Sequence, residues 1–223
     1  MVWRREREEL ALSCFGLLGI LALLAKFRFA LLTAGDQWGL AAVTAHLAPG
    51  GTKWFHAIST LGSPVITGTL IMGIAASAWW HGDRHHAWFW GSVLLSGDVV
   101  AWLVKQLMVR PRPTLPVLAD GGYSFPSGHV FSAMLLALVL WQVLRHQLAA
   151  GRLRGSLTGL VGLGVLLILI SRLVLRAHYP SDTVASLLLA TGWWLQWQVG
   201  WPFLVLWRYR YLGRHDGQRS RGH

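Results

Sequence analysis

Apolar residues in this chain form long runs that are separated by short polar segments. Each run is about as long as the roughly 20 residues that a helix needs to cross a bilayer. The runs cover approximately residues 10–29, 55–80, 87–104, 130–144, 157–175 and 184–207. This pattern predicts an all-α integral membrane bundle of six transmembrane helices.

The first run has an alternative interpretation. Its apolar stretch stops at Ala25, so Lys26 and Arg28 would have to extend toward a membrane interface. A cleaved signal peptide would also explain the arginines that precede it. We favour a transmembrane helix, because no small-residue cleavage site follows closely and the run is long for a signal core.

The composition agrees with a membrane protein. Hydrophobic residues make up 54% of the chain and charged residues 13%, which is too apolar for an ordinary soluble domain. The single cysteine, Cys14, excludes a disulfide framework and a thiolate metal site. No repeat or long linker divides the chain, so residues 1–223 are expected to form one membrane-embedded domain. Tryptophans near the predicted span ends fit membrane interfaces: Trp54, Trp79, Trp80, Trp88, Trp201 and Trp207.

The net charge of +11 could indicate nucleic-acid binding, but its distribution indicates membrane topology instead. Twelve of the 20 lysines and arginines lie before the first run, after the sixth, or in the segments joining runs two to three and four to five. The positive-inside rule then places both termini in the cytoplasm, with residues 208–223 as a basic cytoplasmic tail. We expect a multi-pass protein of the plasma (inner) membrane.

Two connecting segments share the opposite membrane face in this topology. One joins runs three and four and holds KQLMVRPRP (residues 105–113) and FPSGH (125–129). The other joins runs five and six and holds SRLVLRAHYPSD (171–182). Their polar groups therefore face the extracellular or periplasmic side together.

The polar groups of these segments are suited to holding a phosphate. The cations Lys105, Arg112 and Arg172 lie at the ends of two spans, where converging positive charges bind a phosphate dianion. Ser127 and Gly128 lie where a helix starts, so a hydroxyl and backbone N–H groups can point at an anion. The segments therefore predict an anion site at the mouth of a helix.

Two histidines add the groups for phosphoryl transfer. Asp182 follows His178 by four residues, and a carboxylate can accept a hydrogen bond from one imidazole nitrogen and make the other a better nucleophile. A second imidazole, His129, could donate a proton to the leaving group. These parts fit transfer through a phosphohistidine, followed by attack of water.

The three motifs resemble those of the type 2 phosphatidic acid phosphatase family, which includes vanadium haloperoxidases. Lys105, Arg112 and Pro113 fit its first motif, residues 126–129 its second, and Ser171, Arg172, His178 and Asp182 its third. The resemblance implies that His178 is the nucleophile, Asp182 its orienting partner and His129 the general acid. Lys105, Arg112, Ser127, Gly128 and Arg172 would bind the phosphate. The resemblance implies no metal and no other cofactor. The residues agree, because a magnesium site usually needs more carboxylate ligands than these segments contain.

Two further groups of residues have other interpretations. His81, Asp83, His85 and His86 resemble metal ligands, but a solvated cytoplasmic turn accounts for them better. Asp98 lies seven residues before Lys105, on a similar helix face inside the third run. We expect it to support the cationic cluster, directly through Lys105 or through a water.

The resulting prediction is a lipid phosphate or diphosphate phosphatase. Undecaprenyl diphosphate, phosphatidylglycerol phosphate and phosphatidic acid all present a phosphate at the outer interface, and the compact form resembles undecaprenyl-diphosphate phosphatases. Three alternatives remain open: a lipid phosphotransferase using the same phosphohistidine, a vanadate-dependent haloperoxidase, and a non-enzymatic lipid or anion carrier. The partners expected are the bilayer and its lipid substrate, without nucleic acid.

Overall fold

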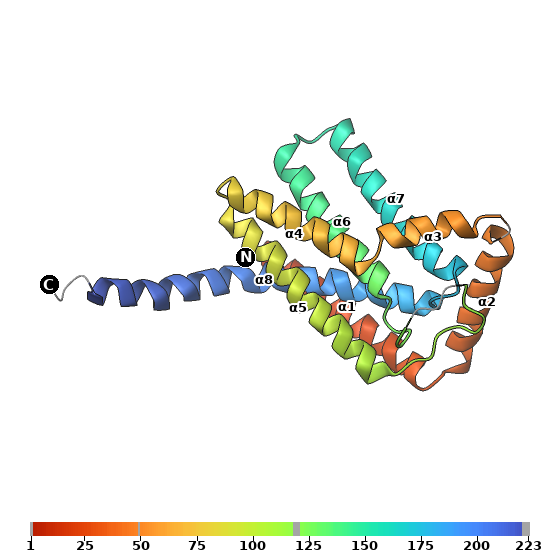
Figure 1. Ribbon diagram of the computed structural model, residues 1–223. Helices are drawn as coiled ribbons and strands as arrows, with labels where there is room; N and C mark the ends of the chain where they lie inside the picture. Colours follow the sequence, from red (N-terminus) through yellow and green to blue (C-terminus); the bar gives the residue numbers. More distant parts are fainter. Residues whose placement is uncertain (1, 49, 118–120, 220–223) are drawn as a thin grey trace.

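The fold of the described residues is entirely α-helical. The computed structural model describes residues 2–48, 50–117 and 121–219, and the side chains of residues 3–48, 50–117 and 121–202. Its helices are α1 (Val2–Lys26), α2 (Ala30–Leu47), α3 (Thr52–Leu61), α4 (Pro64–Trp80), α5 (Arg84–Met108), α6 (Gly128–Gln147), α7 (Arg152–Val174) and α8 (Pro180–Arg219) (Figure 1). The all-α prediction is confirmed for these residues.

Helix α8 is the centre of the bundle. It packs along α1 and α6 and also contacts α5 and α2, while α4 pairs with α5 and α6 with α7. The C-terminal half of α8 projects beyond the other helices in Figure 1. Apolar side chains from α1, α4, α5, α6 and α8 form the core, among them Leu18, Ile71, Val93, Leu94, Phe131, Leu135, Leu189 and Trp194.

Five predicted spans match helical segments that are long and apolar enough to cross a membrane, the second of which is made of α3 and α4 together. They are Trp3–Lys26, Thr52–Trp80, Arg84–Met108, Gly128–Gln147 and Arg152–Val174. The sixth, residues 184–207, lies within α8, which contacts α1, α2, α5 and α6. The count of six spans, the side on which the termini lie and the single-domain assignment therefore stay predictions. Residues 220–223 of the expected basic tail lie outside the described residues.

The predicted second span is two helices instead of one. α3 ends at Leu61 and α4 begins at Pro64, and the direction of the chain changes between them (Figure 1). Ser63 caps α4, with its Oγ accepting a hydrogen bond from the Ile66 N–H at 3.3 Å. The sequence Gly-Ser-Pro contains this signal, because serine caps helices and proline favours their first position.

Helix α2 was absent from the sequence-based prediction. Its 18 residues include Asp36, Gln37 and many small residues, so no long apolar run marks it. It packs against α7 and α8, and a Cβ atom at Gly39 would lie 3.0 Å from Pro180 Cγ. α2 thus lies against the start of α8, next to the predicted motif of residues 171–182.

Candidate active site

The two predicted motif segments meet at one end of the bundle. The Val117 N–H donates to the Leu175 carbonyl at 3.1 Å, and the Ser127 N–H donates to the Asp182 carbonyl at 3.4 Å. These bonds join the α5–α6 connection to the α7–α8 connection. The prediction that the segments share one face is confirmed by these contacts.

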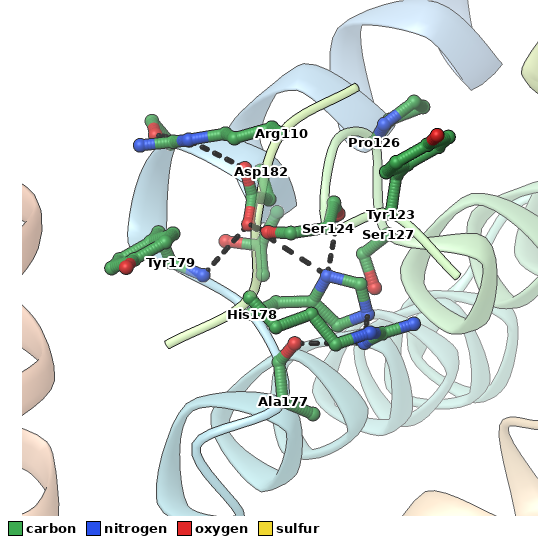
Figure 2. Close-up of polar contacts among 12 residues, drawn as sticks. Arg110, Tyr123, Ser124, Pro126, Ser127, Ala177, His178, Tyr179 and Asp182 are labelled. Atoms are coloured by element: carbon green, nitrogen blue, oxygen red, sulfur yellow. Dashed lines mark hydrogen bonds and ion pairs between the residues drawn. The ribbon is translucent and has the colours of Figure 1, made fainter. Parts of the chain in front are cut away.

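His178 lies in the α7–α8 connection with only 1% of its surface exposed. Its Nδ1 is 2.7 Å from the Ser124 carbonyl oxygen and 3.7 Å from Asp182 Oδ2 (Figure 2). Because a carbonyl only accepts, Nδ1 carries the proton. The other nitrogen, Nε2, is 3.2 Å from Arg112 Nη1, and because a guanidinium only donates, Nε2 presents its lone pair.

This environment keeps the imidazole neutral. Burial lowers the pKa of His178 to about 4, with the charges of Arg172 and Arg112 acting in the same direction and Asp182 opposing them. A neutral imidazole whose Nε2 lone pair is available has the form that a nucleophile needs.

Asp182 serves a wider network than the histidine alone. Its Oδ2 accepts hydrogen bonds from the Ser124 hydroxyl and from the Tyr179 N–H, the latter at 2.8 Å (Figure 2). The Ser124 carbonyl, at 2.7 Å, is therefore a closer partner of His178 than Asp182 is. Asp182 thus holds the Tyr179 backbone, next to His178, and the Ser124 side chain, whose carbonyl contacts the imidazole.

Arg110 connects Asp182 to helix α2. Its Nη1 donates to Asp182 Oδ1 at 2.5 Å and to Ser181 Oγ at 2.7 Å, and its Nη2 donates to Asp36 Oδ2 at 2.6 Å. Asp36 also accepts from the Ser181 N–H at 2.9 Å. The guanidinium lies 4.5 Å from the centre of the Tyr179 ring. One planar cation thus bridges two buried carboxylates, an arrangement that suits arginine better than lysine.

Lys105 and Arg112 hold the connection that carries the Pro-Ser-Gly-His motif. Lys105 Nζ donates to the carbonyls of Tyr123 at 2.7 Å and Pro126 at 2.8 Å. Arg112 donates to the Ala177 carbonyl at 2.8 Å in addition to facing His178 Nε2. A phosphoryl group on Nε2 would therefore lie next to the Arg112 guanidinium.

The Pro-Ser-Gly-His motif forms the start of α6, as predicted. Ser127 is the residue before the helix, Gly128 begins it and His129 is in its first turn. The Ser127 hydroxyl is buried and makes no hydrogen bond with another described residue. A buried hydroxyl beside helix N–H groups is suited to a phosphate oxygen.

Arg172 reaches the site from the last turn of α7. It is 1% exposed, and its Nη1 donates to Ser59 Oγ of α3 at 2.5 Å. The change of direction between α3 and α4 therefore places α3 over this arginine. Ser59 lies in none of the predicted motifs.

Asp98 does not join the cluster. It lies on the exposed side of α5 and forms no hydrogen bond or ion pair with the residues that the structure describes. Lys105 is about two helical turns further along α5 than Asp98, and it extends toward the α5–α6 connection instead of toward Asp98. No three His, Cys, Asp or Glu side chains come together as metal ligands within the described ranges.

Asp36, Arg110, Ser124 and Tyr179 are the site residues that the sequence analysis missed. Arg110 belongs to the same RPRP stretch as Arg112, but only Arg112 has the spacing of the family motif. A carboxylate within an apolar stretch usually has a partner, so the position of Asp36 could have predicted a buried polar contact, although no long apolar run marks its helix.

Three comparisons relate the chain to known proteins. A family model described as PAP2 superfamily matches residues 85–211. Phosphatidylglycerophosphatase B of Haemophilus influenzae is 41% identical over 90 residues, which is 38% of this chain. The match covers 34% of that protein, so the chain spans about a third of the length of this relative.

The fold is also found in a solved structure. The crystal structure of a transmembrane PAP2-type phosphatidylglycerolphosphate phosphatase from Bacillus subtilis superimposes with a TM-score of 0.73. The superposition covers 84% of this chain and 94% of that chain at 21% sequence identity. At this identity the similarity concerns the fold.

Proposed function

Because the chain belongs to the PAP2 superfamily, we propose that it is a membrane phosphatase that hydrolyses the terminal phosphate of phosphatidylglycerophosphate. The observation that carries the proposal is the Nε2 lone pair of a buried, neutral His178 beside Arg112. The names of the two relatives support this lipid over undecaprenyl diphosphate, which the sequence analysis favoured.

The reaction proceeds in two transfers. His178 Nε2 attacks phosphorus, the bond from phosphorus to the ester oxygen breaks, and His129 gives its proton to the leaving alkoxide. Water then attacks the phosphohistidine, His129 takes the water proton, and the phosphorus–nitrogen bond breaks to release phosphate. Lys105, Arg112 and Arg172 stabilise the charge on the phosphoryl oxygens, and the Ser127 hydroxyl and the N–H groups at the start of α6 donate to them.

The orientation in the membrane belongs to the same proposal. The site lies at the end of the bundle opposite the arginines near the start of α1 and in the α6–α7 turn. The positive-inside rule then directs the site to the extracellular or periplasmic side of the plasma membrane.

The test is phosphate release by the purified protein in mixed micelles with excess chelator. Phosphatidylglycerophosphate, undecaprenyl diphosphate and phosphatidic acid are compared, and the first is expected to have the highest kcat/KM. Vanadate should inhibit, because its five-coordinate adduct on His178 resembles the transition state. Preference for another lipid would overturn the substrate, and activity that needs a metal would overturn the mechanism.

Replacing His178 tests the nucleophile. His178→Ala is expected to lower kcat by about four orders of magnitude or more, since no phosphohistidine can form, while lipid binding persists. His46→Ala is the matched control, because His46 is an exposed histidine of α2 whose ring contacts the Ala42 carbonyl. Phosphate release retained in His178→Ala would refute the enzymatic proposal, and transport retained without hydrolysis would indicate a carrier. Transfer of phosphate to an added acceptor lipid would indicate a phosphotransferase, and halide oxidation with vanadate a haloperoxidase.

A further inference from the structure

A second cavity lies at the end of the bundle away from the candidate active site. It has a volume of about 650 Å³ and lies between the start of α1, the start of α5, the end of α6 and the middle of α8. Thirteen residues of α6 separate His129 from Gln142 of this cavity, which is about 20 Å of helix at 1.5 Å per residue. The two sites therefore lie at opposite ends of the bundle.

The lining of this cavity is cationic. Arg7 comes from α1 and Arg145 from α6, and neither forms an ion pair with a described residue. Three histidines, His85, His86 and His146, line it as well. His86 Nδ1 pairs with Asp83 Oδ2 at 2.7 Å, whereas no carboxylate is among the described lining residues themselves. Two converging arginines without a carboxylate partner favour an anionic ligand.

Hydrogen-bond donors complete this surface. The Trp90 indole N–H donates to Gln142 Oε1 at 3.0 Å, which leaves the Gln142 amide N–H groups as donors. The Trp201 N–H points at the ring of His85, 3.1 Å from Nε2 and 3.3 Å from Nδ1. The Arg145 guanidinium lies 4.7 Å from the Trp141 ring centre, and this contact limits its freedom before any ligand binds.

The cavity also has apolar walls. Phe89, Trp141, Trp201 and Pro202 belong to its lining, beside the cations. A free phosphate would use the polar half alone, whereas a phospholipid would place its phosphate on the arginines and its glycerol and first acyl carbons on the rings. Basic pockets between membrane helices on the cytoplasmic side are suited to anionic headgroups.

We infer that this cavity binds the phosphate headgroup of an anionic phospholipid from the leaflet opposite the active site. The inference depends on the charges and walls of the cavity and is independent of the proposed phosphatase activity. Arg7 and Arg145 hold the phosphate, and Gln142 and the histidines donate hydrogen bonds to it.

Native mass spectrometry of the full-length protein in detergent measures this binding. Phosphatidylglycerol, phosphatidylcholine and inorganic phosphate are titrated separately, and one tightly bound phosphatidylglycerol is expected. The Arg7→Gln/Arg145→Gln double variant should bind that lipid about thirtyfold more weakly, since each cation near the surface contributes about fivefold. Arg152→Gln is the matched control, because Arg152 is exposed at the same end but does not line the cavity.

Each outcome decides the proposal. Unchanged phosphatidylglycerol affinity in the double variant would refute it, as would equal binding of phosphatidylcholine. If inorganic phosphate saturates the site at the same concentration as phosphatidylglycerol does, the cavity is an anion site without selectivity for a lipid, and the proposal is refuted. Phosphate release by the double variant in detergent should equal that of the unmodified protein, which separates lost lipid binding from lost folding.

Discussion

At the scale of single residues, the candidate site depends on which nitrogen of His178 carries the proton. The Ser124 carbonyl fixes that proton on Nδ1, and burial keeps the ring neutral with a pKa of about 4. An exposed histidine would have a pKa of about 6.5 and would lose its nucleophilic form in mildly acidic solution. If His178 is the nucleophile, as we propose, the fold extends its working range toward acid.

The pH dependence of kcat/KM tests this environment. The lowered pKa keeps Nε2 of His178 unprotonated above about pH 4. The acidic limb of the kcat/KM profile that reports ionisation of His178 is therefore expected near pH 4. Below that value kcat/KM should fall about tenfold per pH unit. The measured profile is corrected for ionisation of the phosphate itself near pH 6, which is typical of monoesters. An enzyme limb between pH 6 and 7 would contradict the buried, neutral state of His178.

Arg110 is a positioning residue, because it touches Asp182 and Asp36 and not the reacting nitrogen. Arg110→Lys keeps the charge but cannot bridge both carboxylates, so Asp182 and the backbone around His178 should shift. We expect kcat to fall by about 10- to 100-fold with KM changed by less than about threefold.

The control for this substitution is Arg176→Lys. Arg176 lies in the same connection as His178 and donates to the Thr114 carbonyl at 2.9 Å. It should retain most of the activity. Equal kcat values for Arg110→Lys and Arg176→Lys would show that the bridge to Asp36 does not position the nucleophile.

At the scale of elements, α2 and α3 complete a site whose sequence motifs lie elsewhere. α2 supplies Asp36 to Arg110, and α3 supplies Ser59 to Arg172. Both helices precede the residues that match the family model, 85–211. The close approach of the α3–α4 turn to α7 makes this arrangement possible.

Gly62 allows that close approach. A Cβ atom at Gly62 would lie 2.6 Å from Ile168 Cγ2 of α7, so Gly62→Ala should force α3 away from α7 and destabilise the fold by about 1–3 kcal/mol. Gly73→Ala, in the middle of α4 with no atom within 4 Å of its Cβ position, should be neutral or stabilising by up to about 1 kcal/mol. Thermal unfolding in detergent measures both, and opposite signs are expected. Equal thermal unfolding midpoints for the two variants would show that Gly62 is not needed for the packing of α3 against α7.

At the scale of the whole molecule, the candidate active site and the cationic cavity lie at opposite ends of the bundle. The connections between α5 and α6 and between α7 and α8 form the candidate active site, and the opposite end carries the cationic cavity. A lipid phosphatase with this arrangement would act on one leaflet while holding an anionic lipid of the other.

The orientation can be measured with single cysteines, since the chain has only Cys14, which is buried. Leu115→Cys lies at an 81% exposed position of the α5–α6 connection. It should react with a membrane-impermeant maleimide in cells whose inner membrane is intact and whose outer layers have been made permeable. His81→Cys, at an exposed position of the turn between α4 and α5, should react only after the inner membrane is opened. The reverse pattern would place the site in the cytoplasm.

The sequence by itself determined the all-α class, the five spans that match helices and the meeting of the two motif segments. Each depends on local information: a long apolar run specifies a helix in a membrane, and the order of the runs dictates which connections share a face. The spacing of Lys105, Arg112, His178 and Asp182 likewise needs no coordinates.

Only the tertiary structure decided how these residues are held. The proton on His178 Nδ1 depends on the Ser124 carbonyl, 54 residues away along the chain, and the position of Asp182 depends on Arg110 and Asp36. The lack of a contact between Asp98 and Lys105 also depends on which way two side chains of one helix turn. Buried charges and tautomers are set by neighbours in space, and residues distant along the chain become neighbours only when the helices pack.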